Sequence, residues 1–157
     1  MKLAEALALR ADAVKRVEQL KSRVLANARF QEGEDPSEDA TGLLTEADRA
    51  LGELEELIRR INRTNAVATV DDDTTLTDAL ARRDVLRLRH SLWAKAADAA
   101  SGRVDSFGGF RQLRSELRTL PALSVRDVRS TVDDLARQHR ELDVRIQRAN
   151  WEVDLLD

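Results

Sequence analysis

Acidic side chains gather at two places in this sequence, and carboxylates are the groups that bind hard cations such as Mg²⁺ and Ca²⁺. One group lies in "VATVDDDTT" at 67–75, and the other lies in "QEGEDPSEDATG" at 31–42. The surrounding sequence is charged and rich in Ala and Leu, as in long helices. Each acidic stretch is therefore either a metal or catalytic loop or a turn between helices.

Asp71, Asp73 and Thr75 have the spacing D-x-D-x-T after a short apolar run, which resembles the opening motif of haloacid-dehalogenase-type phosphotransferases. That resemblance implies that the first aspartate is a nucleophile and the second an acid/base, both beside Mg²⁺. The motif needs a buried strand of a parallel sheet and a downstream lysine. The one lysine downstream is Lys95, inside a predicted helix. We interpret the stretch as a turn and keep a Mg-dependent phosphotransferase as an alternative.

The remaining candidates for chemistry are also weak. A calcium-binding EF-hand loop beginning at Asp71 would have Leu76 and Arg82 where Gly and Glu are required. His90 and His139 are the only imidazoles, and they do not form the short spacing of a zinc site. The chain has no cysteine, and no G-x-S-x-G motif occurs. The sequence therefore predicts no enzyme and no catalytic, metal or cofactor site.

Helical periodicity dominates the rest of the chain. Apolar residues repeated every three or four positions predict helices at about 2–30, 43–63, 78–102, 110–119 and 124–156. Short β-branched runs on both sides of the three aspartates predict a small β-hairpin at 66–76. The fold class is therefore predicted to be all-α, with long antiparallel helical hairpins or a coiled-coil bundle, one small β-hairpin insertion, and a single domain over 1–157.

The seams of these helices carry the assembly prediction. The positions expected to face inward in the second helix are Leu44, Ala47, Leu51, Leu54, Ile58 and Ile61. In the last helix a run of inward positions from Val125 to Leu156 alternates by three and four, which is typical of coiled coils. Aromatic residues make up only 3% of the chain, so bulky core residues are scarce. Burial by a second copy, and hence a homo-oligomer, is expected.

Polar residues interrupt these seams at Arg10, Asn65 and His139. A buried charge needs a partner, so Arg10 is expected to pair with an acid of another helix or to extend its head group into water. The candidate acids are Asp84, Glu141 and Asp143. His139 is interpreted as a polar position that sets helix register.

The predicted structural and interaction residues combine these seam positions with polar residues near the loop and the C-terminus. Asn62, Arg63 and Asn65 are expected to form a hydrogen-bonded junction with the third helix. The complete set is Arg10, Asn62, Arg63, Asn65, Arg83, Asp84, His139, Asp143, Gln147, Asn150 and Trp151.

Charge and composition limit the partners and the location. The formal net charge is −3, which disfavours a general nucleic-acid binder. The charge is uneven, because residues 31–57 are strongly acidic and residues 79–118 are mostly basic. Such opposite patches can meet within a subunit or between subunits. No signal peptide and no long apolar run occur, so a cytoplasmic protein is expected.

Several stretches resemble the septicolysin-like family of small helical bacterial proteins. They are "NARFQEGEDPSED", "LEELIRRINRTN", "LTDALARRDVL" and "RELDVRIQRANWEVDLL". The family name implies a membrane-active cytolysin, and the resemblance supplies no catalytic residues. From the residues themselves, we expect a non-enzymatic, homo-oligomeric structural or interaction protein, with an unknown protein partner as an addition and a membrane-active protein as the alternative.

Overall fold

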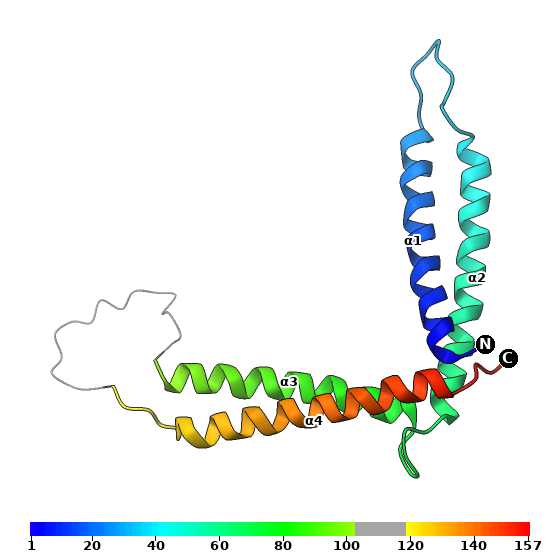
Figure 1. Ribbon diagram of the computed structural model, residues 1–157. Helices are drawn as coiled ribbons and strands as arrows, with labels where there is room; N and C mark the ends of the chain where they lie inside the picture. The colour runs from blue at the N-terminus through cyan, green and yellow to red at the C-terminus, as the bar shows by residue number, and fades with distance from the viewer. Residues whose placement is uncertain (103–118) are drawn as a thin grey trace, which may run out of the picture. The chain divides into compact units, whose positions relative to one another are not determined.

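The computed structural model describes residues 1–102 and 119–157, and all the regular elements in them are helices. They are α1 (Leu3–Asn27), α2 (Ala40–Val67), α3 (Leu76–Ala100) and α4 (Val125–Glu152) (Figure 1). The all-α prediction is confirmed. The helix predicted at 110–119 lies almost entirely outside the described residues. The chain divides into two compact units, one made of 1–77 with 147–157 and the other of 78–146.

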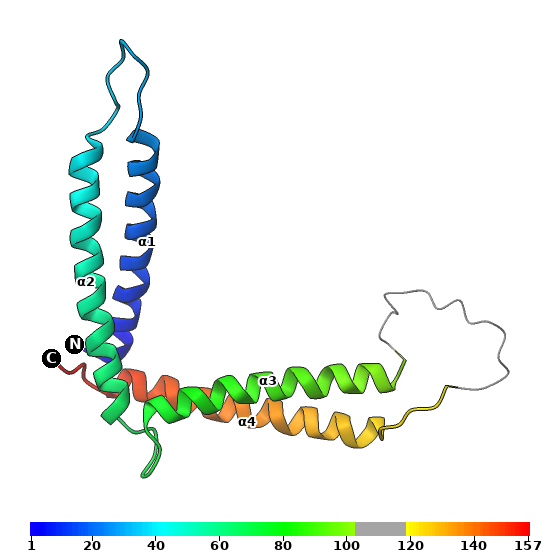
Figure 2. The same ribbon diagram turned by 180° about the vertical axis from the view of Figure 1, so that it is seen from behind.

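In the first unit, α1 and α2 form an antiparallel hairpin (Figures 1 and 2). Asp39 caps α2, because its side chain accepts a hydrogen bond from the Thr41 backbone N–H at 3.1 Å. Gly33 has a φ of +90°, a conformation that suits glycine in the turn between the helices. The apolar cluster between the helices contains Leu20, Leu43 and Ala50, with Val17, Val24 and Ala47 packed against it.

The buried stripe of α2 differs from the predicted seam at several positions. Leu43 and Ala50 are buried, whereas Leu44 and Leu51 are 60% and 48% exposed. The predicted position Ile58 is also 36% exposed, while Ile61 is buried as predicted. Because α2 has apolar residues at adjacent positions, helical periodicity allows two neighbouring stripes, and α1 covers only one of them.

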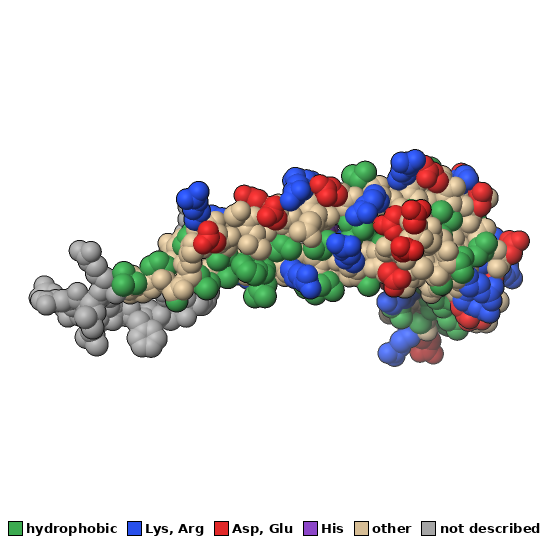
Figure 3. All heavy atoms as spheres, turned by 90° about the horizontal axis from the view of Figure 1, so that it is seen from below, with side chains coloured by type: hydrophobic (Ala, Val, Ile, Leu, Met, Phe, Trp, Pro, Cys, Tyr) green, Lys and Arg blue, Asp and Glu red, His purple; other side chains and the backbone are tan. Residues whose placement is uncertain are grey.

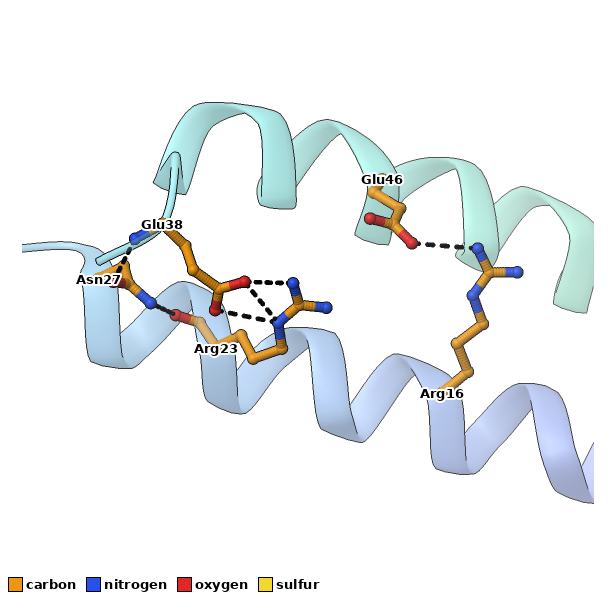
Figure 4. Close-up of polar contacts among 5 residues, drawn as sticks. All are labelled: Arg16, Arg23, Asn27, Glu38 and Glu46. Carbon is orange, nitrogen blue, oxygen red and sulfur yellow. Dashed lines mark hydrogen bonds and ion pairs between the residues drawn. The ribbon is translucent and has the colours of Figure 1, made fainter. Parts of the chain in front are cut away.

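Charged side chains line the edge of this hairpin (Figure 4). Arg23 of α1 donates to Glu38, whose backbone N–H in turn donates to the Asn27 side chain at 3.0 Å. Nearer the start of α1, Arg16 lies 3.1 Å from Glu46 of α2. The hydrogen bonds from Arg23 lower the pKa of Glu38 below its ordinary value of 4.5, because they favour the ionised carboxylate.

Replacing Glu38 with glutamine is expected to cost stability only where Glu38 is ionised. Since its pKa is lower in the folded state, its contribution is present above pH 4.5 and disappears as the pH falls through the lowered value. Thermal unfolding of the parent and Glu38→Gln should therefore differ at neutral pH and converge in acid. Glu34→Gln, in the same turn, is the control. An equal difference at every pH would contradict the prediction. The effect should be small and sensitive to salt, since the pair is exposed.

The β-hairpin predicted at 66–76 is wrong. Helix α2 continues to Val67 and α3 begins at Leu76, and the residues between them contain no strand. One isolated antiparallel bridge joins Thr69 and Thr75, and the Val70 N–H donates to the Thr74 carbonyl at 2.9 Å. The β-branched residues thus form a tight turn instead of strands.

The two ends of the chain meet in the first unit through contacts that we call the terminal clasp. The Leu3 N–H donates to the Val153 carbonyl at 3.0 Å, and the Leu155 N–H donates to the Met1 carbonyl at 2.9 Å. Lys2 lies 2.9 Å from Asp154 and lowers the pKa of that carboxyl. Helix α4 ends at Glu152, before the predicted end at 156. The residues that follow form backbone hydrogen bonds with the N-terminal residues instead of continuing the helix.

In the second unit, α3 and α4 run antiparallel. Arg83 lies 3.6 Å from Asp143, and Arg129 lies 3.1 Å from Asp98. Ser124 caps α4 as its hydroxyl accepts from the Asp127 N–H. The buried side chains of this unit are small or aliphatic and come from both helices. They are Ala79, Leu86, Ala97, Val128, Leu135, Leu142 and Ile146.

Candidate functional site

The aspartate loop has the geometry of a turn held by its own backbone. The Asp71 carboxylate accepts hydrogen bonds from the Thr74 N–H at 2.9 Å and the Asp73 N–H at 3.4 Å. This is the usual role of Asp at the start of a turn. Within residues 1–102 and 119–157 no group of three or more His, Cys, Asp or Glu side chains could hold a metal ion.

The predicted polar junction lies in the first unit, near the terminal clasp. Arg63 donates to the Asp157 carbonyl at 3.3 Å, while Asn62 is exposed and Asn65 is half-buried. Arg63 thus contacts the C-terminal residue Asp157, whereas a contact with the third helix was expected. Gln147 and Trp151 are exposed on α4, and Asn150 is buried.

Three predicted residues come together in the second unit. Arg83 lies 3.6 Å from both Asp84 and Asp143, the latter on α4. This ion pair joins the two helices of the hairpin. Arg10, by contrast, is exposed on α1. It therefore needs no buried acid, and of the two alternatives expected for Arg10 the structure has the one in which the side chain reaches water.

A basic hollow opens between α3 and α4 in the second unit, with a volume of about 270 Å³. Its lining comprises Arg87, His90, Ala136, His139 and Arg140. His139 was predicted as a position that sets helix register, and it is half-buried at this hollow. The other basic residues of the hollow were not predicted. The signal available was their helical spacing, with Arg87 and His90 three apart on one helix and His139 beside Arg140 on the other.

Large apolar side chains also remain exposed on α2 and α3. We call Leu44, Leu51 and Ile58 the α2 ridge, and Val85, Leu88 and Leu92 the α3 ridge. Leu88 and Leu92 are 66% and 67% exposed. Figure 3 shows hydrophobic side chains along an edge of the α3–α4 hairpin, among charged ones. Rows of this kind at helical spacing are typical of surfaces that pack on another helix.

Charges of opposite sign lie beside the two ridges. Exposed Asp48 and Glu55 follow members of the α2 ridge by four residues. Beside the α3 ridge, exposed Arg89 follows Val85 by four residues and exposed Arg82 precedes it by three. Exposed Lys95 follows Leu92 by three. None of these five side chains forms an ion pair with another residue of the described part of the chain. The two surfaces are therefore complementary in charge as well as apolar.

The fold defines an all-helical protein built from long helical hairpins. The chain belongs to a family of unknown function, DUF6847, whose model matches residues 10–155. The septicolysin-like resemblance is therefore wrong, and the cytolysin activity that its name implied loses its basis. In the part of the chain that the structure describes, no helix is both long enough and apolar enough to span a bilayer.

One solved structure is closely similar over the whole chain. It is the crystal structure of a functionally unknown conserved protein from Corynebacterium diphtheriae, with 38% sequence identity and a TM-score of 0.87. The match covers 99% of both chains. No curated protein matches the sequence.

Proposed function

We propose that this chain is a non-enzymatic structural or interaction protein that assembles with copies of itself. The observation that carries the proposal is the pair of exposed apolar ridges on α2 and α3. A water-soluble helix normally places Leu and Ile in its buried stripe, yet Leu44, Leu51 and Leu88 are all largely exposed. Covering these side chains supplies hydrophobic free energy for association.

The partner that fits best is a second copy of the chain. The acids beside the α2 ridge, Asp48 and Glu55, are spaced by one heptad, and so are Arg82 and Arg89 beside the α3 ridge. Equal spacing allows the α2 ridge of one copy to pack along the α3 ridge of another with opposite charges adjacent. The smallest closed assembly that uses both ridges of each copy is a two-fold dimer.

Replacing Leu88 with glutamate is expected to abolish the assembly, because a charge would be buried without a partner. Light scattering after size-exclusion chromatography should give about twice 17.6 kDa for the parent and 17.6 kDa for the variant. Val144→Glu is the matched control, because Val144 is 67% exposed on α4 and outside both ridges. A parent that is monomeric at every concentration, or equal losses in the two variants, would overturn the proposal.

A mixing experiment tests the pairing of the ridges. The double variant Asp48→Arg/Glu55→Arg makes both surfaces basic, and Arg82→Glu/Arg89→Glu makes both acidic. Each variant alone is expected to be monomeric, since like charges repel across the contact. Mixed in equal amounts at low salt, they should form a mixed dimer that weakens as salt is added. Failure of the mixture to associate would exclude the contact between α2 and α3 ridges.

A further inference from the structure

The basic hollow brings together both histidines of the chain, which lie far apart in the sequence. His90 and Arg87 come from α3, and His139 and Arg140 come from α4. The hollow is flanked by two ion pairs that tie the helices together, Arg83–Asp143 and Asp98–Arg129. Its lining residues thus sit on a hairpin whose register is fixed on both sides.

Among the described residues, none that lines the hollow supplies a counter-charge. The described lining contains no carboxylate, and Ala136 is its one side chain without a nitrogen. In the described part of the chain, Arg87, His90, His139 and Arg140 form no hydrogen bond or ion pair with an acid. The acids on either side are engaged, since Asp143 pairs with Arg83 and Asp98 with Arg129. Glu141, the next residue on α4, interacts with Arg137.

Four basic side chains line one small concave space. Guanidinium groups present several N–H donors in a plane, which matches the oxygens of phosphate, and an imidazole adds an N–H donor. A hollow of about 270 Å³ has room for a phosphate group on a small molecule and is at the small end of ligand pockets. A zinc site would need three or four ligands, whereas the hollow offers two imidazoles beside two positive charges.

We propose that this hollow binds the phosphate group of a small ligand, either inorganic phosphate or a phosphomonoester. Arg87 and Arg140 hold the anion through their guanidinium groups, and His90 and His139 add ring N–H donors. The inference is independent of the proposed self-association, since it rests on residues outside both ridges.

The histidine signals in proton NMR spectra provide a direct test, because only two imidazoles contribute. Phosphate and phosphoserine are titrated at constant ionic strength, with chloride as the replacement salt. Saturable shifts of both histidine signals with phosphate, and none with chloride, are expected.

Variants separate a built site from general attraction. Arg87→Gln or Arg140→Gln should weaken phosphate binding by about tenfold or more, as expected for one hydrogen-bonded ion contact. Arg126→Gln, an exposed arginine elsewhere on α4, is the control and should bind as the parent does. Repeating the titration in Leu88→Glu shows whether binding survives without self-association. Shifts that do not saturate, or that are the same in Arg87→Gln, would overturn the proposal. A stronger response to phosphoserine than to phosphate would identify a phosphomonoester as the ligand.

Discussion

Replacing Ile61 with alanine is expected to lower the free energy of unfolding by about 2–5 kcal/mol. Ile61 is 1% exposed on α2, so the substitution removes buried methyl groups and leaves a cavity that its neighbours fill only in part. For a chain of this size the midpoint of thermal unfolding should fall by roughly 4–20 °C. Circular dichroism during heating, with calorimetry to check reversibility, measures the change.

Ile58→Ala provides a matched control in the same helix. Ile58 is 36% exposed, so its truncation should cost much less in the isolated chain. Because Ile58 belongs to the α2 ridge, that variant should also weaken self-association. Equal losses of thermal stability for the two substitutions under conditions where the protein is monomeric would mean that the buried stripe of α2 has been assigned wrongly.

The second large effect is expected from Thr64→Val, which keeps the shape of the side chain and removes its hydroxyl. Thr64 is fully buried, and its hydroxyl donates to the Arg60 carbonyl at 2.8 Å and accepts from the Leu156 N–H at 3.0 Å. Without that acceptor the Leu156 N–H loses its partner, which costs about 1–3 kcal/mol. The C-terminal side of the terminal clasp should open more often.

Hydrogen exchange distinguishes this cause from a general loss of stability. The Leu156 amide should exchange faster in Thr64→Val than in the parent, while amides in the middle of α1 should change less. Thr64→Ser retains the hydroxyl and loses one methyl group, at a cost of about 0.8 kcal/mol, and should preserve the protection of Leu156. Unchanged exchange at Leu156 in Thr64→Val would show that the hydroxyl does not hold the C-terminal segment.

The helices could be predicted from the sequence because their apolar residues recur at one period over many turns. The sequence could not predict which of two adjacent stripes on α2 is buried. Residues 43 and 44 are both apolar, as are residues 50 and 51, so either member of each pair suits the buried position. The turn at 68–75 was mistaken for a hairpin because Val and Thr favour strands only when a partner strand is present.

The candidate site was predicted only in part for a related reason. Arg83, Asp84 and Asp143 were selected individually from the sequence, and the structure brings them together. His90 had no role in any short motif, since its neighbours at the hollow come from a helix far along the chain. Contacts of that kind depend on the register of α3 against α4, which local periodicity does not specify.

The terminal clasp has a consequence for the order of folding. The contacts within each hairpin join segments that are near in sequence, whereas the bond from the Leu3 N–H to the Val153 carbonyl closes almost the whole chain into one loop. Contacts between distant segments form late, because their closure entropy is lost before they return any stabilisation. During synthesis the α1–α2 hairpin is therefore expected to form on the ribosome. The hydrogen bond from Leu3 to Val153 can form only after Val153 has left the ribosome. Truncation before Val153 should leave the hairpins helical and the N-terminal residues unprotected.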